Sequence, residues 1–415
     1  MNSISIISTK SIRIAASFLM ATILFVGIAA TASADTFYVS NSGNDFRDRA
    51  TATNRNTPWK TIQRALNSAF PSDTVVVLRG TYYGHVRFPR SGRSGAPITL
   101  TTENRDDVQI IGSFLGEDIS HIVVQGFDLS NRRTDGPTSK GISFNRTHHV
   151  TIRDNRVHDC RGGGISVDQS DWILIEWNIV HHNAFWDPGQ HSGISVYQAQ
   201  HRAEDSGAFG IIIRNNTCFA NENKVNNVLF NRPTDGNGIA VDDSMNLDPS
   251  GNGVTYNRRT LVTNNFSYLN GGQGIHCYQS ANVFVRNNTT YKNLRSFDFG
   301  GEVSISSSAN CFVYNNVLFA RDGKNVSLQF DSSNIWWDYN TLFNGPVFQA
   351  NNGPNTTYSQ PFLQPGTLRL QSRSPARDNG LTHTGLFPLD VDGQSRIVNG
   401  RIDRGAKEYS PSVDF

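Results

Sequence analysis

The chain has 415 residues, 37% of them hydrophobic and 17% charged, and its formal net charge at pH 7 is +2. This balance argues against nucleic acid or an anionic membrane surface as the binding partner, because both favour a strongly basic protein surface. The 36 glycines disfavour long helices and favour turns and short strands.

Residues 1–34 have the pattern of a signal peptide for export. Lys10 and Arg13 give a basic start, residues 14–30 are mostly apolar, and Ala32–Ala34 supply a cleavage site of small residues. After this leader, no stretch is apolar for long enough to span a bilayer. We therefore expect a secreted or periplasmic protein without membrane contact after cleavage, with an uncleaved membrane anchor as the alternative.

A short amphipathic helix is predicted near the start of the mature chain. In the segment TPWKTIQRALNSAF (57–70), Thr57 suits the N-cap, Pro58 suits the first helical position, and the apolar residues share one face. A single helix before a series of strands is expected to cap the end of a solenoid. Residues 73–84 read as the first strands, so residues 35–84 are predicted to form the cap and first coils.

A short apolar strand that ends in asparagine recurs along the middle of the chain. The closing residues are Asn155, Asn178, Asn216, Asn265, Asn288, Asn316 and Asn340. Their spacings are 23, 38, 49, 23, 28 and 24 residues, and a period near 23 is typical of a solenoid with one coil per repeat. Amides stacked from coil to coil can hydrogen-bond along the axis, so we expect a structural asparagine ladder in a buried turn.

Each coil carries a second strand, and the alternation of its side chains assigns their faces. One inward column is predicted to contain Ile165, Ile194, Ile239, Ile275 and Val303. The first outward column is predicted to contain Ser166, Ser195, Ala240, His276 and Ser304. The next outward column is predicted to contain Asp168, Tyr197, Asp242, Tyr278 and Ser306.

The four cysteines are not expected to form a disulfide that the fold requires. In the repeat alignment, Cys218, Cys277 and Cys311 occupy positions where other coils carry valine or isoleucine, and Cys160 lies in a turn. Cysteine at an aliphatic position behaves as a small buried hydrophobe. An exported chain would permit a disulfide, but the alignment favours free thiols.

Extra residues interrupt the repeat in four places, all around the strands at 193–197 and 238–243. The insertions are residues 183–192, 198–209, 221–237 and 244–258. Long loops around one part of a regular scaffold often carry function, although tolerance of loops alone would give the same pattern. After residue 345 the pattern fades, so residues 345–409 are expected to form the last coils and a C-terminal cap, with 410–415 as a tail.

The ends of the repeat region resemble the right-handed parallel β-helix proteins of the pectate-lyase-like superfamily. The opening FYVSNSGND…TPWKTIQRALNSA…DTVVVLRGTYYG is similar to the start of many secreted bacterial members, and the closing DVDGQSRIVNGRIDRGAKEY is similar to their usual end. This resemblance implies an all-β, single-stranded, right-handed parallel β-helix with an N-terminal capping helix, in one domain over residues 35–409. The superfamily holds lyases, hydrolases, epimerases and binding proteins, so the resemblance is specific for fold rather than activity.

Within the superfamily, polysaccharide lyase family 9 is the nearest chemical template. Its base is a lysine in a strand of the form G-x-G-F-K, and the matching strand here is Gly272–His276, with histidine at the lysine position. Its calcium aspartates lie in a D-D-G-x-D run, and the equivalent stretch here, Gly236–Ala240, retains none of them. Three aspartates flank that stretch and could together form a Ca²⁺ site: Asp235 lies just before it, and Asp242 and Asp243 lie just after it.

The first functional hypothesis is a lyase that cleaves an acidic, uronate-containing polysaccharide by β-elimination. Elimination needs a base for the proton beside the carboxylate, a cation or donor that neutralises the carboxylate, and an acid for the leaving oxygen. His276 points outward between small neighbours and suits a base near neutral pH. Tyr278 or Tyr197 is the expected acid, and the aspartate site above would hold the cation, although an Asp pair at a strand end is equally consistent with a turn.

Five further residues are expected to bind the substrate. His191 and Trp186 lie at the upstream rim, where aromatic faces would suit sugar rings. Arg232, Arg258 and Arg259 lie in the inserted loops and could pair with uronate carboxylates. The expected partner is a polysaccharide, and the chain is expected to be a monomer.

Two alternative functions use the same groove. In a glycoside hydrolase, Asp242 and Glu302 would act as the acid and the base, two coils or about 10 Å apart. In a non-catalytic carbohydrate-binding protein, the polarity of the groove alone would suffice.

Overall fold

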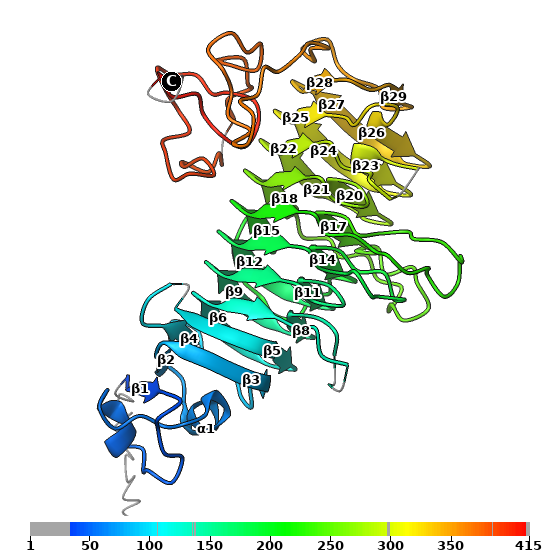
Figure 1. Ribbon diagram of the computed structural model, residues 1–415. Helices are drawn as coiled ribbons and strands as arrows, with labels where there is room; N and C mark the ends of the chain where they lie inside the picture. Colours follow the sequence, from blue (N-terminus) through cyan, green and yellow to red (C-terminus); the bar gives the residue numbers. More distant parts are fainter. Residues whose placement is uncertain are drawn as a thin grey trace, which may run out of the picture. The chain divides into compact units, whose positions relative to one another are not determined.

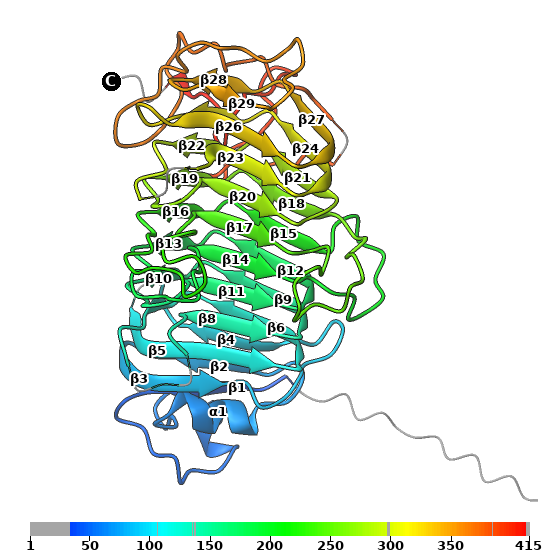
Figure 2. The same ribbon diagram turned by 90° about the vertical axis from the view of Figure 1, so that its right-hand side faces the viewer.

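The computed structural model describes residues 34–411, except residues 106, 135, 137, 297, 298 and 384. The leader at 1–33, on which the prediction of export rests, and residues 412–415 lie outside the described residues. In the described part, the strands of each coil pair in parallel with those of the next coil, and the coils stack as rungs (Figures 1 and 2). The architecture is a parallel β-helix, as predicted.

One side of the β-helix is an eleven-stranded sheet, here called the first sheet. Its strands are β1 (Thr36–Val39), β2 (Thr74–Val77), β4 (Ile98–Thr102), β6 (Ser120–Gln125), β9 (His148–Arg153), β12 (Asp171–Glu176), β15 (Ile211–Arg214), β18 (Thr260–Thr263), β21 (Val283–Arg286), β24 (Ala309–Tyr314) and β27 (Ser333–Asp338). Each coil contributes one strand to this sheet.

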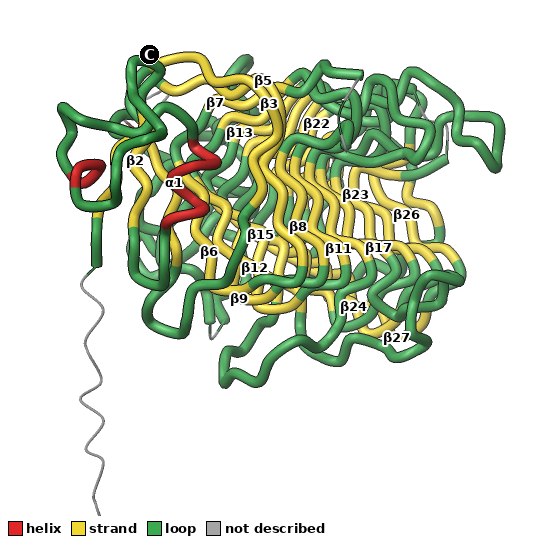
Figure 3. Tube along the Cα trace, turned by 90° about the horizontal axis from the view of Figure 1, so that it is seen from below, coloured by secondary structure: helices red, strands yellow, loops and turns green. Residues whose placement is uncertain are grey.

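The other strands form a second sheet that begins with two long strands, β3 (Gly80–Arg87) and β5 (Val108–Glu117), and then divides into two rows. The short row contains β7 (Asp128–Ser130), β10 (Arg156–His158), β13 (Ile179–His181), β16 (Thr217–Phe219), β19 (Phe266–Tyr268), β22 (Thr289–Tyr291), β25 (Val317–Phe319) and β28 (Thr341–Phe343). The groove row contains β8 (Ile142–Asn145), β11 (Ile165–Asp168), β14 (Ile194–Tyr197), β17 (Ile239–Asp242), β20 (Ile275–Tyr278), β23 (Gly301–Ser306), β26 (Asn325–Phe330) and β29 (Val347–Phe348). Seen from below, the strands of the groove row, among them β8, β11, β17, β23 and β26, follow one another across the molecule (Figure 3).

The predicted register of the groove row is confirmed. Ile194 pairs with Ile239 and Ile239 with Ile275, and all three side chains are fully buried inside the coils. His276 pairs with Ala240 on one side and Ser304 on the other. The four cysteines are free and buried, as the aliphatic columns predicted for Cys218, Cys277 and Cys311.

The N-terminal helix is present, but it begins later than expected. Helix α1 (Ile62–Ser68) has Thr61 as its N-cap, because the Thr61 side chain accepts a hydrogen bond from the backbone of Arg64. The expected N-cap, Thr57, lies in a turn, and Trp59 bridges to Val39 at the edge of the first sheet. Ahead of it lies a 3-10 turn, η1 (Thr51–Thr53). The helix packs on β1, β2 and β3 and so covers the first coils as predicted.

No helix among the described residues combines the length and apolar character that a membrane span requires.

The predicted asparagine ladder is confirmed. Its side chains provide hydrogen-bond partners for the polar groups of the buried turns that follow the strands of the first sheet. From Asn178 onward, the Oδ1 atom of each ladder asparagine accepts hydrogen bonds from both the backbone N–H and the Nδ2 group of the asparagine in the preceding coil, whereas Asn155 accepts one from the backbone of Phe127. For Asn265 these two bonds from Asn216 measure 2.9 and 3.1 Å. The last rung is closed by Arg404, whose guanidinium donates to the carbonyl of Asn340.

A second asparagine ladder, which the sequence analysis missed, follows the short row. Its rungs lie five residues after those of the first ladder: Asn183, Asn221, Asn270 and Asn293. It also explains the glycine that directly precedes β11, β14, β17 and β20: a Cβ on Gly193, for example, would lie 2.5 Å from the amide nitrogen of Asn221. The recurring Gly-Ile pair was therefore the available signal for this ladder.

The C-terminal segment after β29 does more than close the last coil. The described residues of 349–411 form no further regular strand, and the segment folds back beside the earlier coils (Figure 1). The side-chain amide of Asn215 donates to the carbonyl of Asp390, and that of Asn264 donates to Leu389. The segment thus lies against the turns of coils far earlier in the chain.

The expectation that Glu302 faces the groove beside Asp242 is wrong. Its side chain is fully buried, and its two carboxyl oxygens accept hydrogen bonds from the backbone and the side-chain amide of Asn293, at 2.8 and 2.5 Å. Glu302 therefore takes the place of the next rung of the second ladder. This removes it as a partner of Asp242 in hydrolysis.

Glu302 should make the stability of the fold depend on pH. Burial raises its pKa from 4.5 to about 8, against the opposing hydrogen bonds from Asn293. Between pH 4.5 and 8 the folded chain therefore keeps a proton that the unfolded chain releases. The contribution of this proton to the free energy of unfolding is complete below about pH 4.5 and is lost as the pH rises to 8. The Glu302→Gln variant offers a neutral amide oxygen to the same rung. We expect this variant to be more stable than the parent at pH 8.5 by a few kcal/mol, because one pKa unit corresponds to ~1.4 kcal/mol.

Urea unfolding of the parent and of Glu302→Gln at pH 4.5 and pH 8.5 checks this expectation. The two proteins should be similar at pH 4.5 and should differ at pH 8.5. A difference of the same size at both pH values would show that Glu302 does not titrate between them.

Candidate active site in the groove

The groove row carries a pocket over β14, β17 and β20, where three of the four insertions meet the scaffold. Its volume is about 470 Å³, within the roughly 300–1,000 Å³ of small-molecule sites. It is lined by Gly189, Gln190, His191, Ser192, Ser195, Tyr197, Asn227, Phe230, Thr234, Asp235, Ala240, Asp242, Asp248, His276 and Tyr278. Six of the twelve predicted site residues, His191, Tyr197, Asp235, Asp242, His276 and Tyr278, therefore share one cavity.

His276 lies on the floor of this pocket as a half-buried imidazole. Its ring makes no hydrogen bond with any described residue, and the ring of Tyr278 lies 5.9 Å away between centroids. Burial lowers the pKa of His276 to about 4, so the ring is neutral at neutral pH. The paired residues Ala240 and Ser304 are small, which leaves space beside the ring for a ligand.

Three carboxyl groups face the same cavity. Burial, then the nearby charges of Asp235 and Asp248, raise the pKa of Asp242 well above its ordinary value. Burial also raises the pKa of Asp235 to about 6, although Thr234 and Asn237 donate hydrogen bonds to its carboxylate. At least one of these groups therefore retains its proton near neutral pH.

Asp243 was predicted to join Asp235 and Asp242 at a cation, and that placement is wrong. Its side chain is fully buried beneath the loop that follows β17 and accepts hydrogen bonds from the backbone N–H groups of Leu247 and Asp248. The adjacent Asp242 and Asp243 diverge, as strand geometry requires. Within the described part of the chain, the groove carboxylates do not bring three ligand atoms within reach of one ion.

Two tyrosines frame the cavity as hydrogen-bond donors. Burial raises the pKa of Tyr197, whose hydroxyl donates to Asp248 Oδ2 at 2.9 Å. Burial and the charge of Asp242 likewise raise the pKa of Tyr278, whose side chain is 37% exposed. Both phenols are therefore protonated at neutral pH, and Tyr278 is the one without a described hydrogen-bond acceptor.

A histidine–aspartate pair forms the upstream wall. His191 Nδ1 lies 2.6 Å from Asp187 Oδ2, so the carboxylate accepts the Nδ1 proton and orients the ring with Nε2 on its opposite side. Burial would raise the pKa of Asp187, but its bonds from His191 and from the backbone of Gly189 outweigh this and hold the pKa below the ordinary value. The cavity thus contains two imidazoles with different surroundings.

The other predicted substrate-binding residues do not line the cavity. Trp186 lies in a shallow depression with Arg161, and Arg232 is exposed on the loop before β17. Arg258 stacks over the Trp172 ring, and Arg259 stacks over that of Phe284. These arginines precede β18 at the corner with the first sheet, so their guanidinium groups point away from the groove.

Two residues that line the pocket, Asp248 and Phe230, and one that supports His191 from behind, Asp187, were not predicted as site residues. Asp248 lies in the insertion at 244–258, which was predicted to carry function, so its carboxyl group could have been predicted as a site residue on the same grounds. Phe230 is an exposed aromatic side chain in an otherwise polar loop, which was a usable signal. Asp187 lies in the insertion at 183–192, four residues before His191, so these two facts could have indicated it.

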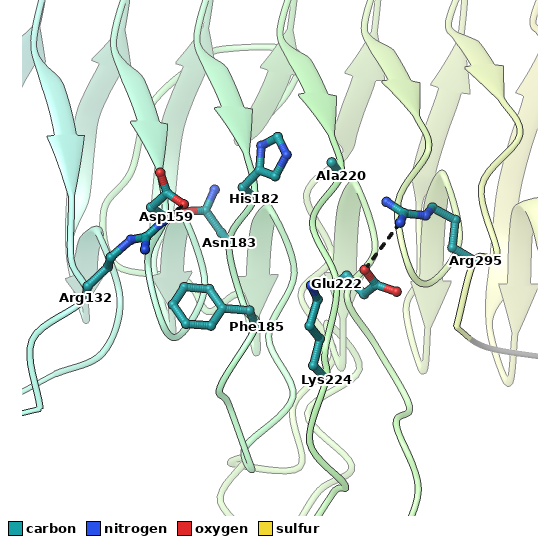
Figure 4. A pocket seen from close by; sticks show the side chains of 9 residues that line it. All are labelled: Arg132, Asp159, His182, Asn183, Phe185, Ala220, Glu222, Lys224 and Arg295. Atoms are coloured by element: carbon teal, nitrogen blue, oxygen red, sulfur yellow. Dashed lines mark hydrogen bonds and ion pairs between the residues drawn. The ribbon is translucent and has the colours of Figure 1, made fainter.

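A second pocket, of about 450 Å³, opens at the bases of the insertions at 183–192 and 221–237 (Figure 4). Arg132 pairs there with Asp159, and Arg295 lies 3.8 Å from Glu222. In each pair, the charges of the arginine and the carboxylate partly neutralise each other. Among its described lining residues, this pocket has no unpaired carboxyl group beside an aromatic ring, unlike the groove pocket. The groove pocket is therefore the candidate active site.

Comparison with known proteins agrees with the fold. Residues 112–258 match a family model described as a right handed beta helix region, so the helix is right-handed, as predicted. Over 139 residues the chain is 24% identical to YwoF of Bacillus subtilis (strain 168), an uncharacterized protein. That match covers 30% of this chain and only 29% of YwoF.

Two solved structures are similar along most of their length. Pectate lyase Pel9A is 16% identical, with 91% of this chain and 98% of that chain covered and a TM-score of 0.49. A rhamnogalacturonan lyase is 14% identical, with 91% of this chain and 97% of that chain covered and a TM-score of 0.47. At this level of identity, the comparison concerns the fold alone.

Proposed function

We propose that the chain is an exported lyase that cleaves a uronate-containing polysaccharide in the groove by β-elimination. One observation carries the proposal: a neutral imidazole without a hydrogen-bond partner, His276, lies beside a protonated phenol, Tyr278, on the floor of the pocket. A base and an acid on one wall are what an elimination needs. The leader pattern at 1–34 supports export.

In the proposed step, the lone pair of His276 takes the proton from the carbon beside the uronate carboxylate. The released electron pair forms a carbon–carbon double bond as the bond to the glycosidic oxygen breaks. Tyr278 donates its proton to that leaving oxygen, so the charges balance. Tyr197 is held by Asp248 and is better placed to orient the sugar than to donate its proton.

The negative charge that develops on the substrate carboxylate must be compensated. The raised pKa of Asp242 keeps a proton on its carboxyl group, which can then donate a hydrogen bond to the substrate carboxylate. A calcium ion would supply the same compensation as a cation, and Asp235 and Asp242 are the groove carboxylates that would hold it. Activity that is lost on chelation and restored by Ca²⁺ would favour the ion over the proton.

The products of a glycan panel test the proposal directly. Polyuronates and neutral glycans are incubated with the protein, and unsaturated uronyl ends are followed by ultraviolet absorbance beside reducing ends. A lyase forms both in equal amounts on a polyuronate. Reducing ends without absorbance would contradict elimination, and neither signal would leave a binding protein.

Tyr278→Phe should lower kcat for elimination by about 10²-fold with little change in KM, because the phenol acts only as the leaving group departs. Tyr291→Phe is the matched control, since Tyr291 lies in the short row and packs on Phe319 away from the groove. A Tyr278→Phe enzyme as active as this control would remove Tyr278 as the acid.

A glycoside hydrolase is the second candidate, because Asp242 and Asp235 are carboxyl groups in one cavity with raised pKa values. Asp242 would protonate the leaving oxygen, and Asp235 would activate a water molecule or attack the sugar. This version replaces Glu302 of the earlier expectation with Asp235. Reducing ends without ultraviolet absorbance would favour it.

A further inference from the structure

Three imidazoles converge at a corner of the β-helix that the groove does not use. His121 lies in β6, and His148 and His149 lie in β9, the neighbouring strand of the first sheet. Each ring offers a nitrogen, and the three nitrogen atoms lie within 4.8 Å of one another. The rings are half-buried, so they are accessible to an ion but partly shielded from water.

The backbone explains why the rings meet. Ser120 pairs with His148 and Ile122 with Val150, so His121 lies beside His149 in the stack. His121 and His149 have left-handed backbone conformations, with φ of 56° and 54°. At the same corner of later coils, the corresponding residues are Asn310 and Asn334. The rings of His121 and His149 therefore stack, with centroids 4.5 Å apart.

Hydrogen bonds define which nitrogen of His149 is available. Its Nε2 lies 3.0 Å from Asp205 Oδ2, so the Nε2 proton is donated to the carboxylate and Nδ1 keeps its lone pair. His148 Nδ1 lies 2.8 Å from that Nδ1, so one proton is shared between two nitrogens that both face the cluster. A carboxylate behind a histidine is the usual outer partner of a metal ligand.

We propose that His121, His148 and His149 form a binding site for one divalent transition-metal ion of the class that prefers imidazole, such as Zn²⁺. Two nitrogens on a tetrahedral zinc lie about 3.3 Å apart, given Zn–N bonds of about 2.0–2.1 Å, so the rings need only small shifts to bind. The ion would replace the shared proton between His148 and His149. Burial and the neighbouring imidazoles lower the pKa values of His121 and His148, which keeps these rings in the neutral form that binds metals.

The site would anchor an insertion that also reaches the groove. Asp205 belongs to the loop at 198–209, which begins directly after Tyr197 of the pocket. At the other end of that loop, Gln198 donates to Asp243 and Gln200 donates to Asn246. A bound ion would therefore connect the part of this loop that carries Asp205 to the first sheet. The start of the same loop would remain hydrogen-bonded to the neighbouring loop after β17.

Calorimetric titration of the full chain, without a histidine tag and cleared of metal by a chelator, tests the site with ZnCl₂. One ion per chain should bind with micromolar or tighter affinity. Because the shared proton is displaced, the binding heat should depend on the ionisation enthalpy of the buffer. Co²⁺ in place of Zn²⁺ should give an absorption spectrum of imidazole ligation.

Variants connect the binding to these three residues. His148→Ala and His121→Ala should each weaken Zn²⁺ binding by at least about tenfold, and Asp205→Asn should weaken it less while one ion still binds. His182→Ala is the matched control: His181 and His182 also approach to 2.8 Å between Nδ1 atoms, but the adjacent His158 uses both nitrogens on Asp128 and Asp159. The control should bind Zn²⁺ as the parent does.

The absence of Zn²⁺ binding by the parent would overturn the proposal, as would unchanged binding by both alanine variants. Asp205 is partly exposed, so Asp205→Asn remains informative if an alanine variant fails to fold. The readout is metal affinity rather than glycan cleavage, so the result is independent of the proposed lyase activity.

Discussion

Replacing His276 with alanine should lower kcat for glycan cleavage by about 10²–10⁴-fold while the fold and KM change little. The imidazole makes no hydrogen bond with a described residue, so its loss leaves no protein partner unsatisfied. Its neighbours Ala240 and Ser304 are small, so the pocket only becomes larger. Initial rates from ultraviolet absorbance on the responsive polyuronate, with thermal unfolding as the check of folding, measure this effect.

His191→Ala separates the two imidazoles of the pocket. If His276 is the base, His191→Ala should raise KM more than it lowers kcat, because His191 is oriented by Asp187 at the rim. Activity of His276→Ala close to that of the parent, with a collapse in His191→Ala, would transfer the role of base to the His191–Asp187 pair. The pKa of about 4 adds a second readout: on the acid side of the pH profile, activity should be retained until the pH drops towards 4 and His276 gains a proton.

The columns of the groove could be predicted because they follow from local rules. Alternation within a strand and one coil per repeat are enough to place His276 between Ala240 and Ser304, and the structure confirms both pairings. The same rules made Asp242 and Asp243 diverge. The error was to count Asp243 as a ligand, although a carboxyl turned away from the groove was the expected outcome.

The loops could not be predicted in the same way, because their side chains are oriented by contacts distant in sequence. Arg258 lies in an insertion beside the groove strands, yet it stacks on Trp172 and pairs with Asp171, both of which are two coils away. Glu302 looked like a groove acid because it opens a groove strand. Its burial follows from the second ladder, which was visible in the sequence as asparagines five residues beyond those of the first and as the recurring Gly-Ile pair.

Replacing Asn265 with alanine should destabilise the chain by about 2–5 kcal/mol. The side chain accepts two hydrogen bonds from Asn216, and it donates to the carbonyl of Ile213 and to Asn288 Oδ1, each at 3.0 Å. Its removal leaves buried polar groups without partners, and each such group costs about 1–3 kcal/mol. Urea unfolding followed by circular dichroism measures the change.

Asn226→Ala provides the control, because Asn226 is exposed and donates only to Asn231 within an inserted loop. It should change the stability by less than about 0.5 kcal/mol. Asn216 and Asn265 are 49 residues apart and span the two insertions beneath the pocket, so their bond holds the register of the coils that carry Tyr197 and Asp242. Equal stabilities of the two variants would contradict that role, whereas a selective loss in Asn265→Ala would show that the ladder keeps the groove aligned despite the long loops around it.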